Sequence, residues 1–154
     1  MREDLMQELR RITEEEEQLL AGGQVDRSLY TTGSAFLIDS DKLLAKGKLI
    51  TVRPHTHNYV EIMYMCSGQT VHHVEGRPPL TLRKGELLFL NQQASHSVER
   101  AGEEDVGVNF IVLPQFFDYA LNLIGTDNVL GRFVLSGVKQ SGGEMRCLHF
   151  RVAE

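Results

Sequence analysis

The sequence has no tryptophan and no apolar run of about 20 residues, the length that a helix needs to cross a membrane. Its N-terminus, MREDLMQELRRITEEEE, carries acidic residues where a signal peptide has an uninterrupted apolar segment. The two cysteines, Cys66 and Cys147, could form one pair, but two thiols in an intracellular chain are more often reduced residues that fill core space. We therefore expect a cytoplasmic protein that does not associate with membranes.

Positive charge is also scarce, because 16 lysines and arginines face 21 acidic residues and the formal net charge is −5. Nucleic-acid binding needs clustered lysine and arginine to neutralise phosphates, so any link to DNA must come from a part of the molecule absent here. Several catalytic signatures are missing, among them Gly-x-Ser-x-Gly, the phosphate loop and His-Glu-x-x-His. The 154 residues predict a single domain with a sizeable core.

Residues 1–28 form an N-terminal helical segment in this interpretation. Leu5, Leu9 and Ile12 follow helical spacing and predict an amphipathic helix over residues 2–20. The glycines at 22 and 23 are expected to end it.

Residues 29–113 change to short apolar runs separated by turn residues. Many short strands at close, even spacing are typical of a sandwich or barrel, so we predict an all-β core. The expected strands are 31–38, 48–53, 60–66, 69–74, 80–82, 86–90, 96–99 and 106–113.

Residues 114–154 return to helical periodicity. One helix is expected to begin at Pro114 and to end at Gly125, and a second is capped by Thr126 or Asp127. The residues of the second helix that should point inward are Leu130, Phe133 and Val134. A last strand-like run covers residues 145–152.

Candidate site residues gather in the stretch RPHTHNYVEIMYMCSG, residues 53–68. On one continuous strand, His55, His57 and Glu61 would project from the same face, and His96 offers a fourth polar group. Three imidazoles and a carboxylate suit a divalent ion such as Zn, Ni, Mn or Fe. The alternative is that these groups line a pocket and hydrogen-bond to one another and to water.

Other residues of the same region have simpler interpretations. Tyr59 and Met63 share the odd-numbered face of the motif strand and are expected to form the wall of a pocket. His72 and His73 are neighbours on a strand, so we predict that His72 lines the pocket and His73 lies on the surface. The acids at 103–105 are expected to be solvated charges of a turn.

The pattern His-x-His, three residues, Glu, six residues, Gly resembles the first motif of the cupins. A second cupin motif, Gly, five residues, Pro-x-Gly, two residues, His, is similar in spacing, although the proline and the glycine are replaced. The matching residues are His55, His57, Glu61, Gly68, Gly85 and His96, whereas Asn91, Gln93 and Arg100 stand in place of the proline, the glycine and a terminal asparagine. The resemblance implies a cupin double-stranded β-helix, a jelly-roll barrel, with His55, His57, Glu61 and His96 around one metal.

The order of parts resembles the N-terminal effector domain of AraC-type transcription regulators, because Pro-Gln-Phe-Phe and two amphipathic helices follow the barrel. The resemblance implies that the barrel, residues 29–113, binds a small-molecule effector, often a sugar. Residues 114–154 would be a helical dimerisation extension with a final strand, giving a homodimer. DNA would be bound only by a helix-turn-helix domain absent from this chain. The function expected is therefore sensing, without catalysis.

A small metal-dependent cupin enzyme, an isomerase or dioxygenase, is the alternative. Its support is the complete set of three histidines and Glu61. Against it stand the altered Pro-x-Gly and the helices that follow the barrel, which cupin enzymes of this size seldom carry.

Overall fold

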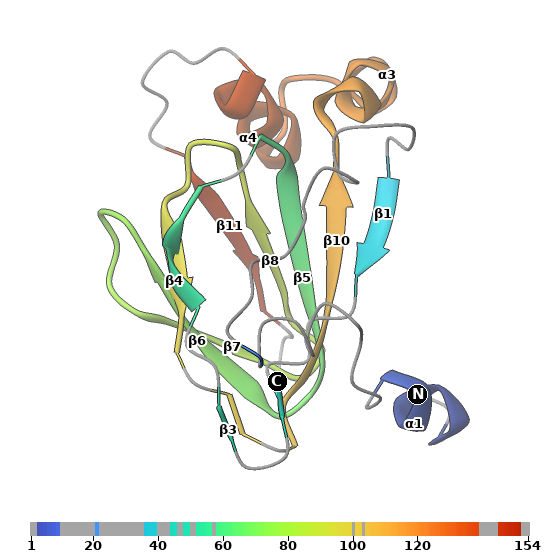
Figure 1. Ribbon diagram of the computed structural model, residues 1–154. Coiled ribbons are helices and arrows are strands. Elements are labelled where there is room, and N and C mark those ends of the chain that lie inside the picture. Colours follow the sequence, from blue (N-terminus) through green and yellow to red (C-terminus); the bar gives the residue numbers. More distant parts are fainter. Residues whose placement is uncertain are drawn as a thin grey trace.

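The computed structural model shows two antiparallel β-sheets with a short helix at the N-terminus and two helices after the barrel (Figure 1). It describes residues 3–9, 21, 36–39, 44–45, 48–49, 52–56, 58–99, 101–102, 104–138 and 145–151. The predicted all-β core with flanking helices is confirmed. No helix in these ranges is long and apolar enough to cross a membrane.

The larger sheet has five strands, and the smaller sheet, which lies across the core from it, has four (Figure 1). The five-stranded sheet runs in the order β1 (Phe36–Asp39), β10 (Val106–Val112), β5 (Val60–Ser67), β8 (Leu87–Leu90) and β11 (Cys147–Phe150). The four-stranded sheet runs in the order β4 (Val52–His55), β9 (His96–Val98), β6 (Gln69–Val74) and β7 (Leu80–Arg83). A separate ribbon pairs β2 (Leu44–Ala45) with β3 (Lys48–Leu49).

The central strand β5 is buried on both faces, because its side chains alternate between the barrel interior and the helices outside the sheet. Met63 and Met65 point into the barrel, where they pack with Leu88 of β8 and Leu82 of β7. Val60, on the opposite face, packs beneath the helices that cover the outside of the sheet. The strand therefore separates the barrel interior from the helical layer.

The two helices α3 (Pro114–Ile124) and α4 (Val129–Val138) supply that layer. Phe117, Phe133 and Val134 pack against Val60 and Val112 of the sheet, so the predicted inward face of α4 is confirmed. The predicted limits of α3 are also correct, since Gly125 follows its last residue and donates its N–H to the carbonyl of Leu121 at 3.0 Å.

The predicted cap of α4, Thr126 or Asp127, is wrong. Asn128 caps this helix, because its Oδ1 accepts the N–H of Gly131 at 2.8 Å. Its Nδ2 also donates to the carbonyl of Ile124 at 2.6 Å. One amide thus satisfies the end of α3 and the start of α4, which the carboxylate of an aspartate could not do because it has no donor.

The N-terminal helix α1 (Glu3–Leu9) is the described part of the helix expected over residues 2–20. Its Met6 packs against Cys66, Val106 and Val108 on the outer face of the five-stranded sheet. Residues 10–20 and the two following glycines lie outside the described residues. Cys66 and Cys147 are buried and free, as predicted, and burial raises the pKa of both thiols.

Among the described residues the strands agree with the sequence analysis except at three places, and residues 31–35 of the expected strand 31–38 lie outside the description. The expected strand 48–53 is wrong, because β3 pairs with β2 and β4 pairs with β9. A run of apolar residues does not indicate where a chain changes its partner strand. The two-residue β2 is too short to give a periodic signal. The last strand is shorter than residues 145–152, and it adds to the five-stranded sheet beside β8.

The turn between β5 and β6 depends on a close backbone approach. Gly68 has φ +66°, and a Cβ added there would lie 2.8 Å from the Cα of Asp105. The carboxylate of Asp105 accepts the N–H groups of Gln69 at 2.7 Å and Gly102 at 2.5 Å. Asp105 therefore holds two turns together, and the interpretation of its carboxylate as a solvated charge is wrong. Glu104 is exposed, and residue 103 lies outside the description.

We predict that Gly68→Ala destabilises the protein by about 2 to 4 kcal/mol, because left-handed strain adds to overlap with Asp105. Gly76→Ala is the matched control, since Gly76 also has a positive φ but has nothing within 4 Å of the added Cβ. The control should cost only about 1 kcal/mol. Urea unfolding of both variants checks this, and equal losses would contradict the role given to Asp105.

Candidate functional site

A cluster of polar side chains lies inside the barrel, between the two sheets. Glu61 of β5, Asn109 of β10 and His96 of β9 are only 5%, 5% and 2% exposed. Asn109 donates its side-chain N–H to Glu61, and the other carboxylate oxygen lies 3.2 Å from Nε2 of His96. The carboxylate of Glu61 thus joins residues of three strands and links one sheet to the other.

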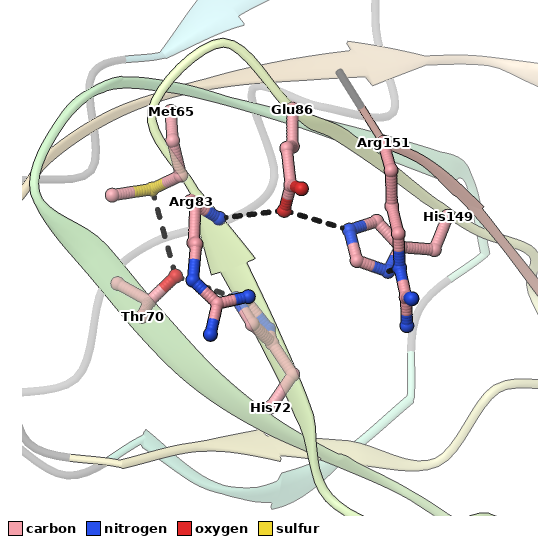
Figure 2. A network of polar contacts seen from close by, with 7 residues as sticks. All are labelled: Met65, Thr70, His72, Arg83, Glu86, His149 and Arg151. Carbon is pink, nitrogen blue, oxygen red and sulfur yellow. Dashed lines mark hydrogen bonds and ion pairs between the residues drawn. The ribbon is translucent and has the colours of Figure 1, made fainter. Parts of the chain in front are cut away.

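His72 adds a fourth polar group to the interior. It is fully buried on β6, and its Nε2 lies 2.8 Å from the hydroxyl of Thr70, which is 3.5 Å from the sulfur of Met65 (Figure 2). Its Nδ1 has no hydrogen-bond partner among the described residues. The neighbouring His73 is exposed and pairs with Glu99 at 2.5 Å. The predicted inward and outward orientations are therefore confirmed.

Burial lowers the pKa of His72 to about 4. The negative charge of Glu61 opposes this shift, whereas His149 and His73 contribute to it. At neutral pH the imidazole of His72 is therefore uncharged. It can accept or donate a hydrogen bond without adding a positive charge to the interior.

A second buried pair lies where β11 meets the start of β8. Glu86 accepts the backbone N–H of Arg83 at 2.8 Å and faces Nε2 of His149 at 2.9 Å (Figure 2). Nε of Arg151 lies 3.5 Å from Nδ1 of His149. Burial acts to raise the pKa of Glu86, but the hydrogen bonds from Arg83 and His149 outweigh it and hold that pKa below its ordinary value.

The structure brings together two of the four predicted ligands, Glu61 and His96. His55 ends β4, and its Cα is in register with that of His96, while its side chain lies outside the description. His57 also lies outside the described residues. Tyr59 is buried against Ile111 and Leu113 near the end of β10, so it lies in an apolar environment. Met63 lies in the apolar core.

The metal site remains a prediction. No group of three or more His, Cys, Asp or Glu placed to hold an ion is found among the residues described. The 3.2 Å between Glu61 Oε2 and His96 Nε2 is compatible with two ligands that each lie about 2.1 Å from one ion. These two donors therefore fit a divalent metal, provided that His55 and His57 complete the set.

A surface cavity of about 340 Å³ lies at the edge of the four-stranded sheet. It lies between the turn at residues 75–77 and residues 95–97, and His96 forms part of its lining. A neighbouring cavity of about 380 Å³ shares Arg77 and extends to Arg146, whose guanidinium pairs with Glu75 at 2.7 Å. Of the four residues of the interior cluster, His96 alone lines the first of these cavities.

Sequence analysis missed three members of these groups. Asn109 could have been found, because it is the one polar residue in the apolar run VGVNFIV of β10. Glu86 and His149 gave no signal, since they are 63 residues apart in the sequence. They meet only because β11 pairs with β8.

We predict that His72 makes the protein less stable in acid. Its pKa is about 4 in the folded protein and 6.5 in the unfolded chain, so the unfolded state binds the proton first as the pH falls. Its stabilising contribution is complete above pH 6.5 and decreases toward pH 4, by about 1.4 kcal/mol per pH unit at most. Urea unfolding at several pH values should show a shallower loss in His72→Gln. A similar change in the exposed neighbour, His73→Gln, would contradict the assignment.

Comparison with known proteins agrees with this architecture. The profile of the AraC-like ligand binding domain family matches residues 38–129. A search of curated proteins gave no match. Among solved structures, apo ToxT K231A from Vibrio cholerae strain SCE256 is similar with a TM-score of 0.56 and 12% identity, over 79% of this chain and 43% of that chain.

ToxT from Vibrio cholerae O395 bound to (E)-4-(8-methylnaphthalen-1-yl)but-3-enoic acid has a TM-score of 0.51 and 12% identity, over 79% of this chain and 44% of that chain. The chain therefore spans less than half the length of these ToxT structures. At such low identity the likeness shows the fold alone. The family profile covers more than half of the sequence, and the chain belongs to the family of AraC-like ligand-binding domains.

Proposed function

We propose that this chain is the effector-sensing and dimerisation domain of an AraC-type transcription regulator, with a sugar or another small polar effector bound in the barrel. The observation that carries the proposal is a buried polar cluster inside a domain of this family. Buried polar groups lower stability unless they are paired, so a barrel without a ligand to bind would be expected to have an apolar interior. DNA would be bound by a helix-turn-helix domain outside this chain.

The chemistry of the cluster suits a hydroxylated ligand. Glu61 can accept hydrogen bonds from hydroxyl groups, while Asn109 can both donate and accept them. His72 is neutral at pH 7, so it too can pair with a hydroxyl. His96 belongs both to this cluster and to the lining of a surface cavity.

The response to an effector would pass through β5. Glu61 points into the barrel, and its neighbour Val60 packs against the helical layer on the other face. A ligand that binds more tightly to one arrangement of β5 would favour the matching arrangement of α3 and α4. The size of this shift is limited by the difference between its affinities for the two arrangements.

A metal-dependent enzyme is the second candidate, and the approach of Glu61 to His96 favours it. A divalent ion held by His55, His57, Glu61 and His96 would supply Lewis-acid chemistry. The two candidates make different demands on the site. A sensor needs only to bind a ligand, whereas the enzyme needs a bound metal and a substrate that it converts.

We predict that a panel of sugars, sugar acids and small carboxylic acids contains a compound that raises the melting temperature of the purified chain. A ligand at 100 times its Kd should stabilise the protein by about 2.7 kcal/mol. Glu61→Gln and His96→Gln should each weaken binding about 10-fold or more, because the first removes the buried negative charge and the second removes the imidazole that faces it. Calorimetric titration measures the affinities.

The matched controls are Glu99→Gln and His73→Gln, which change the same residue types in an ion pair on the outer surface. Both should leave the affinity unchanged. Metal analysis of the wild type and of Glu61→Gln separates the two candidates. Stoichiometric metal that is lost in the variant, together with turnover of a substrate, would overturn the sensing proposal in favour of the enzyme.

We also predict that the helical layer forms the dimer. Its exposed apolar residues are Phe116, Leu123, Ile124 and Val129, which are 41%, 69%, 38% and 47% exposed. Leu123→Glu should weaken the dimer at least 10-fold, because it would bury a charge in the interface. Thr126→Glu adds the same charge at an exposed position between the helices and should have little effect. Sedimentation equilibrium measures both, and a monomeric wild type would contradict the prediction.

A further inference from the structure

The turn that follows β8, residues 91–93, has the sequence Asn-Gln-Gln where the second cupin motif has Pro-x-Gly. A proline and a glycine have no side-chain hydrogen-bond donor, whereas asparagine and glutamine each have one. In this structure all three side chains of the turn donate hydrogen bonds, and they do so to segments that are distant in the sequence. Asn91 and Gln93, which replace the proline and the glycine, therefore add contacts that the motif does not provide, and Gln92 adds another from the variable position between them.

Asn91 connects the turn to α4 and to the segment that enters β11. It is fully buried, and its Nδ2 donates to Oγ of Ser136 at 3.2 Å and to the carbonyl of Met145 at 3.0 Å. Its backbone N–H donates to the carbonyl of Arg146 at 3.1 Å, and its Oδ1 accepts the N–H of Gln93 at 3.0 Å. The side chain of Asn91 thus both fixes the turn, through Gln93, and binds helix α4, through Ser136.

Helix α4 also touches the turn directly. Gly137 is buried, and a Cβ added there would lie 3.1 Å from Oε1 of Gln92 and 3.2 Å from Cβ of Asn91. Nε2 of Gln93 donates to the carbonyl of Ser136 at 3.4 Å. The absence of a side chain at Gly137 lets the helix backbone approach the turn closely, so a displacement of either one must be felt by the other.

The other side of the turn faces the loop that carries the first motif. Nε2 of Gln92 donates to the carbonyl of Asn58 at 3.3 Å. Asn58 lies in the loop before β5 and is three residues before Glu61. The turn also leads directly to His96, which contacts Glu61. One turn therefore contacts the helical layer and the loop that precedes Glu61, and it leads to His96.

We propose that residues 91–93 couple the loop at Asn58 to helix α4, with Gln92 as the positioning residue that joins them. The inference deepens the proposed function, on which it rests, by identifying the route between the effector site and the dimerisation helices. It is a second route beside the direct packing of α3 and α4 on β5. Movement of the loop around an effector would displace Gln92, then Gly137, and so the C-terminal half of α4.

The test adds a methyl group to helix α4 at Gly137 and measures the effect on the loop at Asn58, with no effector present. In the ¹⁵N-labelled chain of 154 residues, Gly137→Ala should shift the amide resonances of residues 58–60 and speed their hydrogen exchange at least twofold. Adding Gln92→Ala should remove at least half of that remote change, although the added methyl group remains. Arg132→Ala, on the exposed side of α4, is the matched control and should leave residues 58–60 unchanged.

A change that stops at residues 91–93, or one that reaches residues 58–60 equally well without Gln92, would overturn the proposal. If Gly137→Ala does not fold, the coupling can be read from the other end. Gln92→Ala alone should then shift the amide resonances of residues 135–138. Unchanged resonances would overturn the proposal. Because no effector is present, a failed ligand screen leaves this result untouched, and a negative result here leaves ligand binding untouched.

Discussion

The alternation of side chains along β5 is the constraint on which the rest of the domain depends. The odd-numbered residues enter the barrel and the even-numbered residues meet the helices, so both faces of one strand are committed to different environments. A shift of register by one residue would place Glu61 under the helical layer and Val60 in the polar cluster. Such a shift would bury a carboxylate without its partners, which is far more costly than the loss of an apolar contact. Specificity of the fold and placement of the site thus have the same origin.

The buried carboxylates of the interior are paired with hydrogen-bond donors or imidazoles, and the buried imidazole of His72 is uncharged at neutral pH. Glu61 is held by an amide and faces an imidazole, while Glu86 receives a backbone N–H and a second imidazole. His72 responds to both groups, because Glu61 favours its protonated form and His149 opposes it. The barrel therefore has two polar groups that are linked electrostatically through one neutral imidazole. A ligand that alters the charge near Glu61 would also be felt at His72, across the core.

Much of the fold could be predicted from the sequence, because the signals are local. The alternation of β5 and β6 correctly placed His72 inside and His73 outside, and the limits of α3 follow from Pro114 and Gly125. The approach of His96 to Glu61 was implied by the resemblance to the cupins, because no local signal connects two residues so far apart in the chain. The features that the sequence did not predict are those that depend on which strands and turns become neighbours in the folded protein. The pairing of Glu86 with a histidine of β11 is set by which strand adds beside β8, and nothing in the local sequence encodes that choice. The carboxylate of Asp105 looked solvated for the same reason, because its partners are turns that only the fold brings near.

The order of strands in the larger sheet also bears on how the chain folds during synthesis. β1 pairs with β10, so Phe36 can pair only after Val112 has emerged from the ribosome. In the same way, β8 gains its second neighbour, β11, only after residue 150 has been made. The pairing of β6 with β7, by contrast, joins nearby segments and can form early. Long-range pairing of this kind slows folding, because the loop must be closed before its contacts are gained. The growing chain thus carries β1 and the apolar outer face of β5 without their final partners until the later segments have been made.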